Sequence, residues 1–260
     1  MGFRIVIVIS LQIMATPAHA VSSDAQAAYE AAVSQARAAM MRDPGEALDA
    51  AGRAAALLEE EQAGPERAEM LARAEWLQAE ALTRLGRPAE AEPVVEAGLE
   101  RLGADPEPTK LYADLQVARG RIAVARGDFE TGFLSFTAAY DVFQALEEPR
   151  SQAIVLQSIG SIYTAAHQYE RALTYFDDAM ARYSDPSLDL AGLNNRANAL
   201  RELGLYEAAL AAYEQALESA SALGSPMLEA RILNNIAALH VNFDAFEAAE
   251  AALAEADARV

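Results

Sequence analysis

The sequence predicts an all-α protein, an α-solenoid of about six antiparallel helix–turn–helix repeats that forms a right-handed superhelix. Three observations favour this fold. Alanine, leucine, glutamate and arginine, which all stabilise helices, dominate the 260 residues. A pattern of large and small apolar residues recurs about every 37 to 41 residues. Prolines and glycines alternate along the chain as start and stop signals for helices.

The clearest repeat spans residues 153–186. Its first half carries Leu156, Ile159, Gly160 and Tyr163, and its second half carries Ala172, Phe176 and Ala179. This spacing indicates two paired helices, with small residues where the pair touches and large residues between repeats. The same register divides the chain into units at about 24–61, 65–102, 108–146, 149–184, 186–223 and 226–259. The first unit is degenerate and matches only at Ala38, Ala47, Ala51 and Ala54.

Prolines and glycines support the same division. Proline is tolerated in the first turn of a helix, where its missing N–H has no helical partner. Glycine ends a helix at low cost because it adopts a left-handed conformation. Prolines fall just before or at the start of the expected first helices, at Pro65, Pro108, Pro149, Pro186 and Pro226. Glycines fall between the two helices of a unit, at Gly86, Gly127 and Gly204.

These residues resemble the tetratricopeptide repeat (TPR), whose pattern is L…LG..Y followed by A…F..A. A recurring [Y/F]-E-x-A at Tyr169, Tyr206 and Phe246 makes a different α-solenoid or a plain helical bundle a weaker interpretation. The resemblance covers residues 24–259. Units of about 40 residues are similar to those of kinesin light chains, bacterial peptide-pheromone regulators and the sensor regions of bacterial signalling enzymes, so we identify a long-unit, exported bacterial type.

The first 20 residues differ from the rest. Arg4 precedes an apolar run at residues 5–15, and Pro17 is followed by the cleavage pattern Ala18-His19-Ala20. This layout predicts a secretory signal peptide at 1–20. The alternative is a retained anchor, although a spanning helix needs about 20 residues. We expect residues 21–260 to form the solenoid, exported to the periplasm of a Gram-negative bacterium without membrane insertion.

Composition excludes several function classes. The net charge of −19 argues against nucleic-acid binding and against docking on anionic lipids. The absence of cysteine excludes disulfides, thiolate catalysis, iron–sulfur clusters and a lipoprotein anchor. Lys110 is the single lysine among 20 basic residues, a usage typical of a GC-rich bacterial genome.

No catalytic or metal-binding pattern is found. The sequence has neither a glycine-rich phosphate loop nor a G-x-S-x-G motif. His167 and His240 lie in different repeats without clustered ligands, so no metal and no cofactor is expected. We expect His167 to be solvated in a turn and His240 to pack in the core. The chain is predicted not to be an enzyme, unless it is a fragment of one.

The resemblance implies that the first helix of each repeat lines a concave groove, with its second, fifth, ninth and twelfth positions facing a partner. In the second to fourth repeats these positions hold Arg73, Trp76, Glu80 and Thr83; Asp114, Val117, Arg121 and Val124; and Ile154, Gln157, Ser161 and Thr164. In the last two they hold Ala191, Asn194, Asn198 and Arg201; and Arg231, Asn234, Ala238 and Val241. The residues that we predict to bind a partner are Arg73, Trp76, Arg121, Gln157, Asn194, Asn198, Arg201, Arg231, Asn234 and Asn235.

Two assignments stay open. Asparagine is unfavourable inside helices, so the recurrence of Asn194-Asn195 at Asn234-Asn235 needs a reason. The amides either bind a peptide backbone or tie one helix to the next. Trp76 is either a groove anchor or a core residue. The carboxylate clamp of some TPR proteins is incomplete because Asn194 replaces its first lysine, so binding to chaperone tails is not expected.

The sequence favours a non-catalytic periplasmic TPR scaffold that binds a protein or peptide in the amide- and arginine-rich groove of the last two repeats. The alternative is the sensor region of a larger membrane signalling protein, a diguanylate cyclase or histidine kinase, with its catalytic domain outside this chain. The last helix carries Phe246 and Leu253 on an apolar side that no later helix covers. This end is therefore a candidate for self-association or for further domains.

Overall fold

The computed structural model describes residues 21–104 and 106–259, and the regular elements of this part of the chain are twelve α-helices. The predicted signal peptide lies outside the described residues. Consecutive helices form six pairs: α1 (Ser23–Ala39) with α2 (Pro44–Ala56), α3 (Pro65–Arg84) with α4 (Pro88–Arg101), α5 (Lys110–Ala125) with α6 (Phe129–Ala145), α7 (Pro149–Ala165) with α8 (Tyr169–Arg182), α9 (Pro186–Glu202) with α10 (Tyr206–Ala222), and α11 (Pro226–Asn242) with α12 (Phe246–Asp257).

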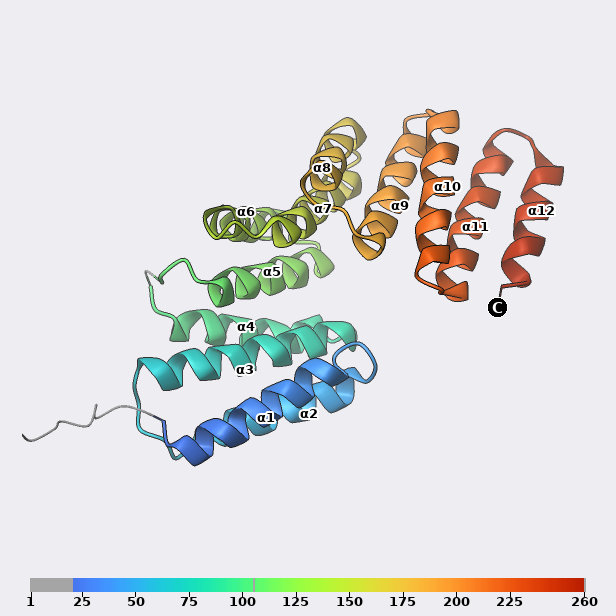
Figure 1. The fold of residues 1–260 in the computed structure, drawn as a ribbon. Coiled ribbons are helices and arrows are strands. Elements are labelled where there is room, and N and C mark those ends of the chain that lie inside the picture. The colour runs from blue at the N-terminus through green and yellow to red at the C-terminus, as the bar shows by residue number, and fades with distance from the viewer. Residues whose placement is uncertain (1–20, 105, 260) are drawn as a thin grey trace, which may run out of the picture.

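The pairs stack in chain order into an elongated solenoid (Figure 1). The direction of the helices turns along the stack: α3 to α6 run across the view, whereas α9 to α12 run up and down. Each helix packs mainly on its neighbours in sequence. Beyond these contacts, first helices touch first helices, α3 with α5, α5 with α7 and α7 with α9. The first helices α3, α5, α7 and α9 therefore share one face, as the resemblance implied.

The helices begin and end near the prolines and glycines that predicted their boundaries. Prolines occupy the first turn at Pro65, Pro149, Pro186 and Pro226. Glycines with positive φ separate paired helices at Gly86 (71°), Gly127 (82°) and Gly204 (74°). The same turn position is taken in the fourth and sixth pairs by His167 and Asp244, with φ of 56° and 57°. Residues with side chains thus adopt the left-handed turn in those two repeats at some cost in free energy.

Small residues allow the paired helices to touch. A Cβ atom at Gly120 would lie 2.6 Å from the ring of Phe136, and one at Gly160 would lie 2.5 Å from the ring of Phe176. Both rings are almost fully buried. Glycine is thus required at these two sites because any side chain would displace an aromatic ring from the core.

The first pair is a complete helical hairpin despite its degenerate sequence. Ala47, Ala51 and Ala54 are fully buried as expected. Ala38, however, is exposed, and Ala36 and Ala39 face the core instead. The predicted register of α1 was therefore wrong, because it was matched on an alanine and not on Tyr29 and Val33, the large residues that mark the buried face.

The last helix leaves apolar side chains uncovered. Phe246 and Leu253 of α12 are 58% and 47% exposed. The matching residue of Phe246 one repeat earlier, Tyr206, packs edge-on against Phe243 with ring centroids 5.1 Å apart. Among the helices that the structure describes, none has both the length and the apolar character needed to cross a membrane.

Candidate functional site

The first helices of the second, third and fourth repeats enclose a cavity of about 270 Å³, which we call the groove cavity. Its walls come from α3, α5, α6 and α7. They are Trp76, Glu80, Lys110, Asp114, Val117, Phe143, Arg121, Arg150, Ser151 and Ile154. Six of these occupy the sequence positions expected to face a partner: Trp76, Glu80, Asp114, Val117, Arg121 and Ile154. Three successive repeats thus form the groove cavity together, and its walls carry both apolar and polar side chains.

Trp76 packs on the core and also lines the groove cavity. Its half-buried side chain packs against the core between the first and second repeats and against the core between the second and third. The same side chain lines the groove cavity. An indole held by the core on one side and open to a hollow on the other forms a rigid apolar wall.

Charges in the groove cavity are arranged by depth. The carboxylate side chains of Glu80 and Asp114 are only 12% and 23% exposed. The basic side chains of Arg121, Lys110 and Arg150 are 38%, 51% and 55% exposed. Acidic groups therefore form the inner wall, and basic groups form the more solvated rim.

Two arginines satisfy Glu80. Arg121 Nη1 lies 3.1 Å from Glu80 Oε1, an ion pair between α5 and α3. Arg84 Nη2 lies 3.8 Å from Glu80 Oε2. Arg121, predicted as a free groove residue, therefore also joins two repeats. Because it is partly exposed, this pair adds little to stability.

Asp114 is less well satisfied. Its one ion pair in the described residues is with Lys110, whose Nζ lies 3.7 Å from Oδ1, a long and therefore weak contact. Burial raises the pKa of Asp114 from 3.8 to about 6, since removal from water disfavours the charged form. The nearby Glu148 and Glu80 also raise this pKa, and Lys110 opposes them.

Lys110 bridges the rim of the cavity. Its Nζ atom lies 3.4 Å from Glu148 Oε2 and 5.0 Å from the centroid of the Phe143 ring. It is the first residue of α5, where the positive end of the helix dipole disfavours a cation. The nearby carboxylates and the Phe143 ring thus stabilise the Lys110 ammonium, although the positive N-terminus of α5 disfavours it.

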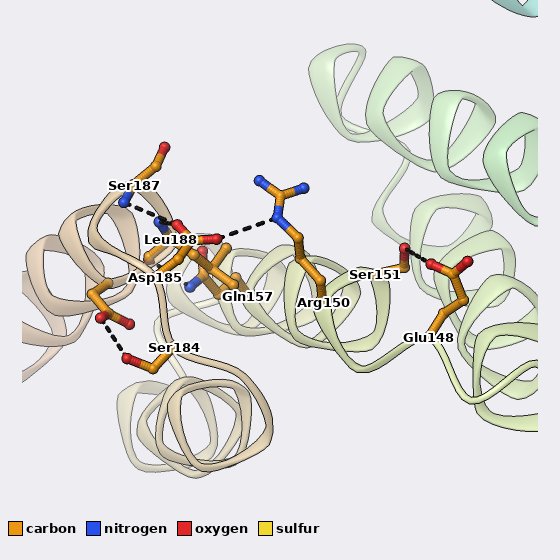
Figure 2. Close-up of polar contacts among 9 residues, drawn as sticks. Glu148, Arg150, Ser151, Gln157, Ser184, Asp185, Ser187 and Leu188 are labelled. Carbon is orange, nitrogen blue, oxygen red and sulfur yellow. Dashed lines mark hydrogen bonds and ion pairs between the residues drawn. The ribbon is translucent and has the colours of Figure 1, made fainter. Parts of the chain in front are cut away.

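The junction between α7 and α9 anchors the far rim (Figure 2). Arg150 Nε donates to Asp185 Oδ2 at 3.2 Å. Asp185 Oδ1 caps α9 by accepting from the backbone N–H groups of Ser187 and Leu188 at 3.0 and 2.9 Å. These hydrogen bonds hold the pKa of Asp185 below its ordinary value, and the bond from the backbone N–H of Leu188 has the largest effect. Arg150 is therefore engaged by Asp185, the residue that caps α9.

Gln157 corrects a prediction. Its side chain is buried, and Nε2 donates to the backbone oxygen of Leu188 at 3.0 Å (Figure 2). A Cβ atom at Gly192 would lie 2.8 Å from this nitrogen, so α9 passes directly over the amide. Gln157 therefore ties the fourth repeat to the fifth and is not available to a partner in the groove.

The predicted amides of the last two repeats mostly bond to the protein itself. Asn235 Nδ2 donates to Asn194 Oδ1 at 2.8 Å, linking α11 to α9. The buried Tyr213 donates its hydroxyl to Asn198 Oδ1 at 2.5 Å. Of the two interpretations, tying one helix to the next describes these three amides. Asn198 also lines a second hollow of about 180 Å³ with Ser161, Thr164, Phe176 and Asn195.

The remaining predicted residues lie outside the groove cavity. Arg73 pairs with Glu69 at 3.2 Å, and Arg201 pairs with Glu202 at 2.9 Å. Arg231 and Asn234 are exposed on α11. The ten predicted residues are therefore spread along the solenoid, and the cavity brings together Trp76 and Arg121 only.

The histidines lie in separate surroundings. His167 is exposed in its turn, as expected, with Nδ1 2.7 Å from the hydroxyl of Tyr169. His240 is half-buried near the end of α11 rather than fully packed. Within residues 21–104 and 106–259, no group of three or more His, Asp or Glu side chains is placed to hold a metal ion.

Sequence comparison identifies the repeat. Two family models described as tetratricopeptide repeat match residues 153–184 and 190–222, which hold the pairs α7–α8 and α9–α10. The chain therefore contains tetratricopeptide repeats in these two pairs. No curated protein matches it in sequence.

Solved structures share the TPR solenoid. The apo quorum sensor NprR of B. thuringiensis aligns with a TM-score of 0.72 at 14% identity, over 92% of this chain and 66% of that one. BtubC (BKLC) of P. vanneervenii aligns at 0.65 and 16%, over 92% and 91%. A Rap protein in complex with competence and sporulation factor aligns at 0.64 and 16%, over 91% and 65%. At these identities the likeness establishes the fold of this chain alone.

The groove cavity includes residues that the TPR position rule missed. Lys110, Arg150 and Ser151 come from the first turns of α5 and α7, and Phe143 comes from the second helix α6. The rule considers only four positions in the middle of first helices. One signal was visible in the sequence, because Lys110 is the single lysine in an arginine-rich chain.

Proposed function

We propose that this TPR protein is a non-catalytic scaffold that binds a peptide, or an extended segment of a protein, in the groove cavity. The observation that supports this most directly is the cavity itself, which three successive repeats line with apolar walls and charged groups. Ligand sites of proteins are typically such apolar hollows with a few polar groups. A Rap protein of the same fold is known in complex with competence and sporulation factor.

The proposal moves the working surface from the last two repeats to the second, third and fourth. Asn194, Asn198 and Asn235 are engaged within the protein, so binding through them would require breaking bonds that join helices. The groove cavity needs no such rearrangement. A partner segment would gain contact with Trp76 and Ile154 while the rim charges stay hydrated.

A selection from a random peptide library on the purified protein tests this function. Because Trp76 is the only tryptophan and lines the cavity, its fluorescence should change when a selected peptide binds. We expect Ile154→Ala to weaken binding about tenfold, as loss of a central apolar contact does. Leu134→Ala, at an exposed leucine of α6 outside the cavity, is the matched control. Selected peptides that bind Ile154→Ala equally well and leave Trp76 unperturbed would refute the site.

We also propose export to the periplasm, supported by the signal-like residues 1–20. Mass spectrometry of the protein from cell fractions should find a periplasmic form that begins at Val21. A cytoplasmic protein that retains Met1 would contradict the proposal.

The alternative, that these repeats form the sensor region of a larger signalling protein, has one supporting observation. Phe246 and Leu253 on α12 are exposed at positions whose counterparts in α10, Tyr206 and Tyr213, pack against neighbouring side chains. Such a face fits a further helix or a second molecule. The gene sequence tests this idea: an apolar span of about 20 residues followed by a catalytic domain supports it, and a stop codon after Val260 opposes it.

A further inference from the structure

We propose that the groove cavity selects a basic side chain, arginine or lysine, of its partner, and that Asp114 receives the cation in place of Lys110. This inference rests on the proposed function, since it names the chemistry of the segment that the cavity binds. It follows from three features of the cavity: the depth of the carboxylates, the incomplete pairing of Asp114, and the position of Lys110.

The depth of the charges favours a cation that enters from the groove. Glu80 and Asp114 form the inner wall, and the protein's own bases lie at the rim. A long basic side chain can pass between the apolar walls of Trp76 and Ile154 with its methylene groups in contact and its charge at the inner end. An acidic side chain on the same path would approach two carboxylates.

Asp114 is held by one long contact and can accept further hydrogen bonds. Its carboxylate is mostly shielded from water, yet in the described part of the chain its one ion pair, with Lys110, is 3.7 Å long. Carboxylates out of water are stabilised by charge-assisted hydrogen bonds of about 2.7–2.9 Å. A guanidinium or ammonium group from a partner would supply such a bond. The nearby arginines are less available to Asp114, because Arg121 pairs with Glu80 and Arg150 pairs with Asp185.

Lys110 shows which kind of group this place accepts. Its ammonium lies near an aromatic ring and between two carboxylates, those of Asp114 and Glu148. It is nevertheless an exposed side chain at the first residue of α5, where the helix dipole opposes it. A partner's cation that arrives from the groove side would displace Lys110 toward solvent at little cost. Lys110 thus acts as a weak internal competitor for the ligand.

An anionic ligand is the opposite possibility, and the two make opposite predictions for Lys110. If the cavity takes a cation, Lys110→Gln removes a competitor and increases affinity. If the cavity takes a carboxylate at the rim, Lys110→Gln removes a binding group and decreases affinity. The sign of this one effect therefore distinguishes them.

The experiment titrates the purified protein with capped pentapeptides that differ at a central residue and are followed by Trp76 fluorescence. The central residue is arginine, its neutral isostere citrulline, or glutamate, flanked by leucine and alanine. We expect the arginine peptide to bind about tenfold more tightly than the citrulline peptide, because a charge-assisted hydrogen bond is replaced by a neutral one. Asp114→Asn should abolish this preference, and Lys110→Gln should strengthen binding of the arginine peptide about threefold.

The control variant is Asp178→Asn, which removes an exposed carboxylate of α8 outside the cavity and should leave the preference intact. Circular dichroism checks that each variant is folded. Equal binding of the arginine and citrulline peptides would overturn the inference but leave the groove function standing. Preference for the glutamate peptide, weakened by Lys110→Gln, would overturn it in favour of an anionic ligand. If neither these peptides nor library peptides perturb Trp76, both the inference and the proposed function fail.

Discussion

The third and fifth repeats present the same groove positions but use them differently. In α5 these positions hold Asp114 and Arg121, which face a hollow that a partner can enter. In α9 they hold Asn194 and Asn198, which bond to Asn235 and Tyr213 of the following helices. Of these four residues Asp114 is the least engaged within the protein, since its one ion pair is 3.7 Å long, whereas Arg121 pairs with Glu80 of α3.

The first way to test this contrast is Asn198→Ala. The change leaves the buried hydroxyl of Tyr213 without its acceptor, and an unsatisfied buried hydroxyl costs about 1–3 kcal/mol. We expect the free energy of unfolding, measured with urea, to fall by this amount. Adding Tyr213→Phe should recover part of the loss, since the stranded hydroxyl is then removed.

Asn234→Ala provides the matched control, because Asn234 is an exposed amide of α11. Its removal should change stability by less than about 0.5 kcal/mol. If Asn198→Ala were equally harmless, the amides of the fifth repeat would be as free as those at the surface, and the contrast with the groove cavity would disappear.

The second prediction concerns Asp114, whose replacement should raise the free energy of unfolding rather than lower it. Its pKa is raised to about 6 in the folded protein from an ordinary 3.8. The folded state therefore holds a proton more tightly than the unfolded state, and the charged carboxylate costs stability above about pH 6. Asp114→Asn should raise the free energy of unfolding by about 1–2 kcal/mol at pH 7.5.

This gain should shrink as the pH falls through 6 towards 4, because the carboxyl group of the parent protein then becomes neutral in the fold. Burial of Asp114 sets this window first, and the charges of Lys110, Glu148 and Glu80 adjust it. Thermal melts at pH 7.5, 6 and 5, with Asp178→Asn as control, measure the change. A gain that is constant with pH would show that Asp114 is not the titrating group. A variant that is more stable yet binds basic peptides less well would mark Asp114 as a binding residue.

Much of the fold could be predicted because its signals are local. The left-handed turns at Gly86, Gly127 and Gly204 and the prolines in first turns each depend on backbone geometry within a few residues. The register of α1 was mispredicted because the match relied on Ala38, whereas the large residues Tyr29 and Val33 mark the buried face. In that helix Ala36 is buried and Ala38 is exposed, although their side chains are identical.

The site could be predicted only in part. The groove positions of α3 and α5 identified Trp76 and Arg121, which do line the cavity. Gln157 occupies an equivalent position but is covered, because α9 passes close enough for its backbone to accept a hydrogen bond. Phe143 enters from a second helix. Such outcomes depend on distances between repeats, which spacing along the chain does not contain.

The third prediction measures the smallest effect and addresses the contrast most directly. Asn194 and Asn235 form one hydrogen bond between α9 and α11, both half-buried, so a double-mutant cycle to alanine should give a coupling energy of about 0.5–1.5 kcal/mol. The same cycle on Arg121 and Glu80, the corresponding polar link between α5 and α3, should give a smaller value, because Arg121 is partly exposed and water screens the pair from that side. Equal coupling energies would mean that the cavity residues contribute to stability as much as the amides do. A larger coupling for the amides would support the contrast between the two regions. The groove residues of the last repeats would then join helices to one another, whereas those of the middle repeats would remain available to a partner.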